Sequence, residues 1–518
     1  MKSITTKFIL VILGWLLFSA LPAWSADAQA PAAAAQPAKP TVEAKAAAAK
    51  PAGKEEPVLS PEEAKAKMLK PFKALSKESA TCASCHKEKT PGIFQQWGAS
   101  KHFGANVGCY ECHKAEKGDP DAINHKEFTI SVIVSPKDCG ECHNTEVEQF
   151  TKSHHAKAAE ILGSLDNILA DVAEGNMDFR GESAATVNGC WQCHGSPVKV
   201  LPNGDLDPAT WPNTGIGRIN PDGSKGSCAA CHQRHEFSMV QARRPESCGK
   251  CHLGPDHPQK EIYDESKHGI NFYANVDRMN LASAKWVAGE DYDVAPTCAT
   301  CHMSATSELP ITHDVGDRIS WTLRPPISEK IDAKAVKEGK AVKSWMDRRK
   351  DMKNVCTSCH GTNTVEAFYE QFDGLVNLYN NKFAIPGQKL MTIALKEKLL
   401  TETAFDEKLE WTWYLLWHHE GRRARHGASM QGPDYTHWHG TFEVAHRWYT
   451  EMVPEVQELI EKSEKAGKHE GAQKLKAALD EILNSPDHRW FIGKMPEDEK
   501  ARRKAQMEEF KQRYLQAK

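Results

Sequence analysis

The sequence predicts a mainly α-helical protein with few strands, in which a cysteine-rich N-terminal part is followed by a bundle of long helices. Three observations support this class. All 16 cysteines lie before residue 362. Beyond that point, apolar residues recur at spacings of three and four, with charged residues on the opposite faces. The best strand candidate is one short segment, residues 129–134.

The N-terminus has the parts of a secretory signal peptide. Lys2 and Lys7 supply the positive charge, residues 8–21 the apolar stretch, and Ala23-Trp24-Ser25 a small-x-small cleavage site. We therefore expect residues 1–25 to be a signal peptide and the mature protein to be exported to the periplasm. The apolar stretch is short for a membrane span and no later segment approaches one, so we expect no membrane-spanning helix after cleavage.

The composition of residues 26–57 differs from that of the rest of the chain. They are mostly Ala, Pro and Lys, which cannot bury enough apolar surface to offset the entropy lost on ordering. We expect a disordered linker here. The net charge of the whole chain is −3, with 66 basic and 69 acidic residues, so no basic field indicates a nucleic-acid partner.

Every cysteine belongs to a CxxCH motif, and there are eight such motifs. Two thiols at this spacing can form thioethers to both vinyl groups of one haem, and the histidine that follows falls under the iron as its proximal ligand. Zinc ribbons do not require that histidine, and disulfide frameworks show no such spacing. The sequence therefore predicts eight covalent c-type haems, an electron-handling function and a multihaem cytochrome c core. In chain order, each motif's two cysteines and proximal histidine are Cys82, Cys85 and His86; Cys109, Cys112 and His113; Cys139, Cys142 and His143; Cys190, Cys193 and His194; Cys228, Cys231 and His232; Cys248, Cys251 and His252; Cys298, Cys301 and His302; Cys356, Cys359 and His360.

Other histidines recur at regular offsets from these motifs. An aromatic-x-x-Ser-x-His pattern occurs three times and an Ile-x-His pattern twice, as distal axial ligands would. A lone histidine is more often a hydrogen-bonded surface residue, but the repetition favours ligation. Bis-histidine ligation holds lower potentials than His/Met ligation. The expected distal ligands are His102, His155 and His268 from the first pattern, His125 and His313 from the second, and His235 and His418 as further candidates.

We expect residues 58–362 to form the haem-binding domain and residues 363–518 a long-helix C-terminal region. Pro386, Pro486 and the stretch 427–433 separate the periodic segments of this second region. His469 and His488 lie in polar sequence, which favours solvated side chains. The expected helices are residues 366–381, 389–425, 442–466, 471–484 and 497–516.

Eight CxxCH motifs followed by long helices resemble the octahaem hydroxylamine oxidoreductase family. The most specific stretches are residues 248–259 (CGKCHLGPDHPQ), 418–426 (HHEGRRARH) and 432–440 (GPDYTHWHG). The resemblance implies that the haem on Cys190 and Cys193, with His194 as proximal ligand, is catalytic and has an open distal face. It also implies that the other haems carry electrons and that the protein is a homotrimer.

The resemblance further suggests catalytic roles for Asp256, His257 and Tyr435. A histidine tuned by an adjacent carboxylate suits a nitrogen compound that exchanges protons together with electrons. Asp256 could instead cap a turn while His257 ligates another haem. Oxidative members carry a tyrosine cross-linked to the catalytic porphyrin of a neighbouring subunit, and Tyr435 is the candidate here. A tyrosine on an apolar helical face is more often packing than chemistry.

These interpretations predict a periplasmic oxidoreductase of small nitrogen compounds, chiefly the oxidation of hydroxylamine, with electrons passed to a partner cytochrome. Two alternatives stay open. The same site could reduce nitrite or hydroxylamine to ammonium. From another class, the chain could be a non-catalytic electron conduit in which every iron is six-coordinate, because the histidine supply permits it.

Overall fold

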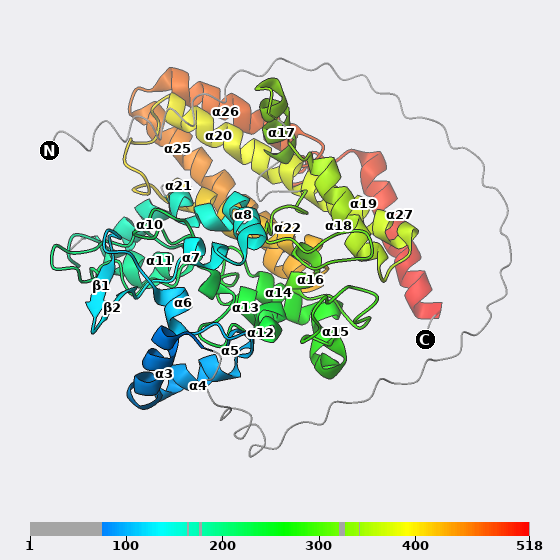
Figure 1. Ribbon diagram of the computed structural model, residues 1–518. Helices are drawn as coiled ribbons and strands as arrows, with labels where there is room; N and C mark the ends of the chain where they lie inside the picture. The colour runs from blue at the N-terminus through cyan, green and yellow to red at the C-terminus, as the bar shows by residue number, and fades with distance from the viewer. Residues whose placement is uncertain (1–74, 163–164, 176–178, 321–326, 341, 517–518) are drawn as a thin grey trace, which may run out of the picture. The chain divides into compact units, whose positions relative to one another are not determined.

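The computed structural model describes residues 75–162, 165–175, 179–320, 327–340 and 342–516, all within one compact unit, Lys65–Lys518 (Figure 1). The expected signal peptide, residues 1–25, and the expected linker, residues 26–57, lie outside the described residues. Within the described part of the chain, helices predominate and the sheet has two strands, so the prediction of a mainly α fold with few strands is confirmed. None of the described helices has the length and apolar content needed to cross a membrane.

The CxxCH motifs lie in or beside short helices. Polar side chains start several of them: Ser135 and Asp138 form a capping box at the third motif, and Thr297 and Thr300 do so at the seventh. Short helices suit this region because each motif needs only one turn. The motif-bearing elements are α3 (Lys77–Lys89), α6 (Cys109–His113), α7 (Pro136–Gly140), η2 (Thr186–Cys190), α11 (Trp191–His194), η3 (Cys228–Ala230), α13 (Pro245–Gly249), α16 (Cys298–His302) and α18 (Trp345–Thr357).

The remaining elements of this region connect the motifs or carry the repeated histidines. Three of those histidines lie at the start of a helical turn that follows a buried serine, Ser100, Ser153 or Ser266. These elements are α4 (Pro91–Ala99), α5 (Lys101–Gly104), α8 (Asn144–Lys152), η1 (His155–Lys157), α9 (Ala158–Ile161), α10 (Leu165–Glu174), α12 (Met239–Arg243), α14 (Gln259–Glu265), α15 (Lys267–Ala274), η4 (Val276–Met279) and α17 (Ile327–Lys337).

The two strands form an antiparallel hairpin between the second and third motifs. β1 (Ala122–His125) pairs with β2 (Phe128–Ser131), with Ile123 opposite Ile130. β2 overlaps the strand expected at residues 129–134 but ends earlier, because the Ser131 hydroxyl hydrogen-bonds Asp121 and the backbone N–H of Ile133. The hairpin places His125 at its turn.

The C-terminal region contains long helical rods interrupted by single turns of π-helix. α19 (Thr362–Tyr379) continues through η5 (Asn380–Ala384) into α20 (Ile385–Lys396). Pro386 cannot donate to the Lys382 carbonyl oxygen one turn earlier, and that oxygen accepts from His488 Nε2 instead. A second rod consists of α21 (Lys408–Tyr414), η6 (Leu415–Glu420) and α22 (Gly421–Ser429). A third consists of α23 (Pro433–Thr436), η7 (His437–Phe442), α24 (Glu443–Arg447), η8 (Trp448–Met452) and α25 (Val453–Lys465). Two separate helices follow, α26 (His469–Asn484) and α27 (Glu497–Gln516).

The single helix expected at residues 389–425 is wrong. The chain leaves the helix after Lys396 and re-enters it at Lys408, with Lys398 and Phe405 at positive φ. The Thr401 side chain hydrogen-bonds Asp406, and its backbone N–H donates to Glu407, which fixes the turn. The segment between the two helices contains no glycine or proline, and apolar residues keep a helical spacing through it. The sequence pattern therefore did not indicate the break.

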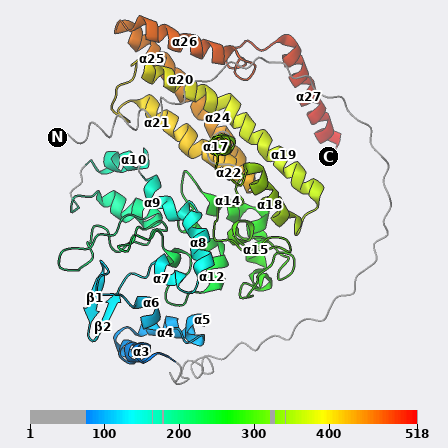
Figure 2. The ribbon, with the colours of Figure 1, turned by 45° about the horizontal axis from the view of Figure 1, so that its top comes forward.

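The main hydrophobic core lies between the C-terminal helices. α20, α25 and α26 pack together (Figure 2), and Leu416, Trp448, Met452 and Leu475 are fully shielded from solvent there. Burial of each such side chain contributes about 1.5–3 kcal/mol. The motif-bearing region has a smaller apolar cluster around Phe272, Met279 and Trp286.

His488 does not have the solvated side chain that its polar sequence favours. It is 1% exposed, accepts or donates one hydrogen bond with Tyr449 Oη (2.9 Å) and donates another to the Lys382 carbonyl oxygen (2.8 Å). Its ring also stacks on Trp448. The partners come from distant segments, so local sequence polarity could not predict the burial.

Candidate haem sites and active site

Six of the eight proximal histidines face a second histidine from outside the motifs. The ring centroids of each pair are 6.0–6.5 Å apart, and each of these six second histidines is one expected from the sequence as a distal ligand. His252 has a second neighbour as well, because the ring of His257 is also 6.0 Å from it. The pairs are His86 with His125 (6.1 Å), His113 with His235 (6.3 Å), His143 with His102 (6.2 Å), His232 with His313 (6.5 Å), His252 with His155 (6.0 Å) and His360 with His268 (6.0 Å).

This spacing fits an iron atom between the two rings. A metal bonded at about 2 Å to one nitrogen of each ring holds the ring centroids roughly 6 Å apart. The outer nitrogens are oriented as a ligand requires: His113 Nδ1 donates to the Ser131 carbonyl oxygen (2.8 Å), and His86 Nδ1 bonds the Thr90 hydroxyl (2.9 Å). The chain's own residues therefore fit bis-histidine haems at these six motifs.

Contacts between cysteines define which motifs are neighbours. The pKa of the Cys139 thiol is raised chiefly by a hydrogen bond with Cys228, which joins the third and fifth motifs. Cys193 raises the pKa of Cys251 in the same way, and Cys298 that of Cys248. The sixth motif therefore touches both the fourth and the seventh, which makes it a branch point between motifs.

His194 and His302 differ from the other proximal histidines. Neither belongs to a ring pair, and no histidine of the described residues lies at a comparable distance from them. His302 Nδ1 is 3.3 Å from the Val315 carbonyl oxygen. His194 Nδ1 is shielded from solvent and has no hydrogen-bond partner. The fourth and seventh motifs therefore lack, among the described residues, the close ring pair that the other six have.

Asp256 and His257 lie in the loop that follows the sixth motif. The loop turns at Gly254, whose φ of +95° favours glycine. Asp256 Oδ1 is 3.5 Å from His257 Nε2, and its Oδ2 accepts a hydrogen bond from Arg422 Nη1 (3.1 Å). His418 Nδ1 is 4.0 Å from the same Oδ2. One carboxylate therefore organises two imidazoles and a guanidinium.

This cluster lies against the sixth motif, where the ring of His257 is 6.0 Å from that of His252. Burial, together with the nearby His257, His302 and His194, lowers the pKa of His252 to about 4, so the fourth and seventh motifs are also within electrostatic range of this ring. The Cys193–Cys251 contact connects the fourth and sixth motifs.

His418 lies in the π-helical turn η6, near the Asp256 carboxylate. Its ring stacks on Tyr414 at 4.4 Å and contacts Trp417 and His419. Ligation of a haem by His418 stays a prediction.

Tyr435 lies in α23, half-exposed, with its ring 5.4 Å from that of His439. Burial raises the pKa of Tyr435, and Glu265 and Glu261 raise it further. Trp438 and Phe442, one and two turns later, are 56% and 48% exposed. Tyr435 therefore belongs to an outward aromatic surface of this chain and is not part of the Asp256 cluster.

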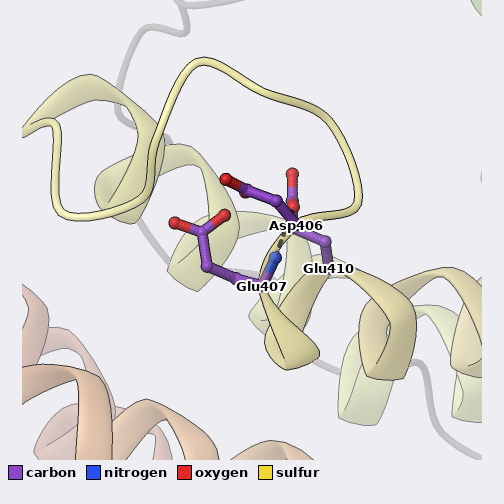
Figure 3. A group of neighbouring side chains, drawn as sticks. All are labelled: Asp406, Glu407 and Glu410. Carbon is purple, nitrogen blue, oxygen red and sulfur yellow. Dashed lines mark hydrogen bonds between the residues drawn. The ribbon is translucent and has the colours of Figure 1, made fainter.

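An acidic group at the start of α21 has a structural explanation. Asp406, Glu407 and Glu410 point their carboxylates toward one another (Figure 3). Glu407 accepts from the Thr401 N–H (2.8 Å), Glu410 accepts from the Glu407 N–H (3.3 Å), and Asp406 bonds the Thr401 hydroxyl. These side chains satisfy backbone donors at a helix start, as capping residues do.

Sequence reasoning did not assign the roles of Arg422, Arg425 and Gln259. Arg422 and Arg425 lie in the HHEGRRARH stretch, one turn apart on α22. Gln259 Nε2 is 3.5 Å from His426 Nε2. The sequence feature that could have pointed to the two arginines is their place in a run of arginines on a helix with a buried face.

Two known families match separate parts of the chain. Residues 221–401 match the family described as seven times multi-haem cytochrome CxxCH. Residues 28–114 and 138–208 match cytochrome c554 and c-prime. A probable nitrite reductase–hydroxylamine oxidoreductase fusion protein of Kuenenia stuttgartiensis is 27% identical over 338 residues, 56% of this chain and 35% of that protein. This chain is a multihaem c-type cytochrome related to hydroxylamine oxidoreductase-like proteins. It spans about a third of the length of that relative.

Solved structures agree with this relationship. A hypothetical multihaem protein is 29% identical, with a TM-score of 0.62 over 75% of this cytochrome and 97% of that chain. The reducing HAO-like protein complex of Kuenenia stuttgartiensis is 19% identical, with a TM-score of 0.57 over 76% of this cytochrome and 87% of that chain, and shares the fold. The C-terminal long helices of this cytochrome therefore belong to a known multihaem architecture.

Proposed function

We propose that this cytochrome is a periplasmic octahaem oxidoreductase that oxidises hydroxylamine at the haem on Cys190 and Cys193. One observation carries the proposal: His194 has no histidine opposite it, while Asp256, His257 and His418 gather at the sixth motif, which its own motif contacts. An open distal side with proton-exchanging groups nearby suits a small ligand that loses protons together with electrons.

Held by Cys190, Cys193 and His194, the haem would supply an iron site for the substrate nitrogen and an acceptor for its electrons. The protein residues bind and move protons. His257 directs Nε2 toward Asp256, whereas its Nδ1 is shielded and without a partner, so Nδ1 is the atom available to take a proton from a ligand. Arg422 donates a hydrogen bond to Asp256 and holds its carboxylate beside His257.

The six facing histidine pairs support electron transfer away from this site. The sixth motif adjoins the fourth, so its haem is the expected first acceptor beyond the catalytic one. A partner cytochrome would take the electrons from the protein surface. The family resemblance further supports a homotrimer, and the exposed Tyr435–Phe442 surface is the region that a second subunit would cover.

Reduction of nitrite or hydroxylamine to ammonium is the second candidate. The structural relative from Kuenenia stuttgartiensis is described as a reducing HAO-like protein, which favours this direction. The two candidates differ in whether Tyr435 of one subunit is bonded to the catalytic porphyrin of another. A pure conduit is the third reading, and the lack of a histidine opposite His194 argues against it.

An absorption spectrum of the reduced protein, together with denaturing mass analysis, tests these alternatives. Hydroxylamine oxidation predicts eight haems, a distinct long-wavelength band and a haem–peptide adduct containing Tyr435. Ordinary c-haem bands, no adduct and a nitrite-sensitive high-spin component would favour reduction. A fully low-spin protein that is inert to nitrite and hydroxylamine would contradict both enzyme proposals and leave the conduit.

A further inference from the structure

Arg425 is a buried cation whose hydrogen-bonding capacity is largely unused. Its side chain is 6% exposed, and Nε donates to the Gly421 carbonyl oxygen of its own helix (2.9 Å). Its Nη1 is shielded from solvent without any partner. No carboxylate of the described residues lies within ion-pair distance of it. A guanidinium has five N–H donors, so most of this group's capacity is open.

The other buried arginines of the described residues are well satisfied. Arg218 donates to the Asn220 side chain (2.7 Å) and to the carbonyl oxygens of Asn213 and Val134. Arg349 makes two bonds to Asp373, of 2.6 and 2.8 Å. Arg318 donates to the carbonyl oxygens of Cys301 and Pro310. The contrast shows that this fold provides partners where an arginine is buried for structure alone.

The surroundings keep Arg425 charged and in place. The Tyr379 ring lies against one face of the guanidinium, 4.8 Å from its carbon to the ring centroid. Gly421 leaves room for Tyr379, whose hydroxyl lies where a Cβ would be. Burial lowers the pKa of Arg425 to about 10, so it still carries its proton at neutral pH. An isolated buried charge costs several kcal/mol unless an opposite charge accompanies it.

Arg425 lies next to the proposed active site. Arg422, one turn earlier on α22, pairs with Asp256, and His426, the next residue, approaches Gln259 two positions after His257. Asp256 is already shared among Arg422, His257 and His418, so it cannot neutralise Arg425 as well.

We propose that Arg425 binds a buried oxyanion beside the Asp256 cluster. A carboxylate or nitrite, each planar with two acceptor oxygens, matches the parallel donors of a guanidinium. Two sources supply such a group: the propionate of a bound haem, or nitrite as substrate or product. The nitrite source rests on the proposed function, whereas the propionate source requires only that haem is attached.

The test compares Arg425→Met and Arg425→Lys with Arg423→Gln in the haem-loaded protein. Arg423 is the matched control, because it lies on the same helix and already pairs with Glu443. Two quantities are measured: the midpoint potentials of the haems, by spectroscopic redox titration, and the nitrite dissociation constant, from the spectral shift of the oxidised protein.

If the anion is a propionate, Arg425→Met shifts the potential of one haem to a more negative value, because a positive charge near that haem is lost, and nitrite affinity changes less than about twofold. If the anion is nitrite, the affinity falls about tenfold or more while the potentials stay unchanged. Arg423→Gln leaves both quantities as in the wild type.

Wild-type potentials together with wild-type nitrite affinity in Arg425→Met would overturn the proposal. Should that variant fail to accumulate, Arg425→Gln removes the charge as well and gives the same shift in potential. Arg425→Lys tests the nitrite source separately, since lysine keeps the charge but cannot donate two parallel bonds. A wild-type protein that does not respond to nitrite would count against the proposed function, while the potential shift would still decide the propionate source.

Discussion

The two regions of this cytochrome are built on different cores. Residues 362–484 contain the larger hydrophobic cluster, with Leu416, Met452 and Leu475 fully shielded. The motif-bearing region has short helices, a two-stranded hairpin and facing histidine pairs. The comparison indicates that the C-terminal region can be stabilised by side chains alone, whereas the N-terminal region depends on its haems.

The strongest test of this difference is to prevent haem attachment. Without haem, we expect residues 75–361 to lose protection from hydrogen exchange and proteolysis, because the porphyrins supply much of their apolar contact. The segment 362–484 should keep protected helices. Hydrogen exchange followed by mass spectrometry checks both regions in one sample. Equal loss of protection in both would contradict the two-core description.

A core truncation in the C-terminal region should cost stability without altering the haems. Leu475→Ala removes a fully buried side chain and is expected to lower the free energy of unfolding by about 2–5 kcal/mol. The absorption spectrum of the folded protein should stay unchanged. Glu481→Ala, on the same helix, has an exposed side chain and serves as the control. A spectral change in Leu475→Ala would show that the two cores are coupled.

Two histidine substitutions sharpen the comparison further. His235→Ala removes the ring that faces His113 and should convert one low-spin haem to high spin, seen by electron paramagnetic resonance. His488→Ala removes two buried hydrogen bonds and should cost about 1–3 kcal/mol with no change of spin state. A change of spin state in His488→Ala would contradict a purely structural role for His488. No change in His235→Ala would contradict its role as a haem ligand.

The smallest expected effect is the pH dependence of the acidic group at α21. Burial raises the pKa of Glu410 to about 7, above its usual value of 4.5. The folded state then holds more protons than the unfolded state between these values, so stability falls as pH rises through that window. Glu410→Gln keeps an acceptor for the Glu407 N–H and should flatten the dependence. Thermal unfolding between pH 5 and pH 8 measures the slope, and an unchanged slope would assign it to other groups.

The fold class and most of the facing histidines could be predicted from the sequence, because both depend on patterns that repeat locally along the chain. The serine-anchored pattern identified His102, His155 and His268, and each faces a proximal histidine. The pattern did not indicate which proximal histidine each of them faces. His102, for example, follows the first motif along the chain but faces the proximal histidine of the third. Such pairing is decided by tertiary contacts.

The misjudged features share a different cause. The position of His418 beside Asp256 was not predicted, because a π-helical turn leaves no mark in the apolar periodicity. The helix break after Lys396 contains no glycine or proline, and its positive φ values fall on Lys398 and Phe405. Arg425 was given no role from the sequence, because its burial against Tyr379 depends on the packing of distant helical segments.

The facing histidines also bear on how the chain reaches its folded state. Each pair joins segments separated by at least one other motif or loop, as His113 and His235 do across the third, fourth and fifth motifs. A metal bound between them closes a long loop, much as a disulfide does, and removes conformational freedom from the unfolded chain. Such non-local closures form slowly. Covalent attachment at the cysteines would hold each cofactor on the chain while its distant second ligand approaches.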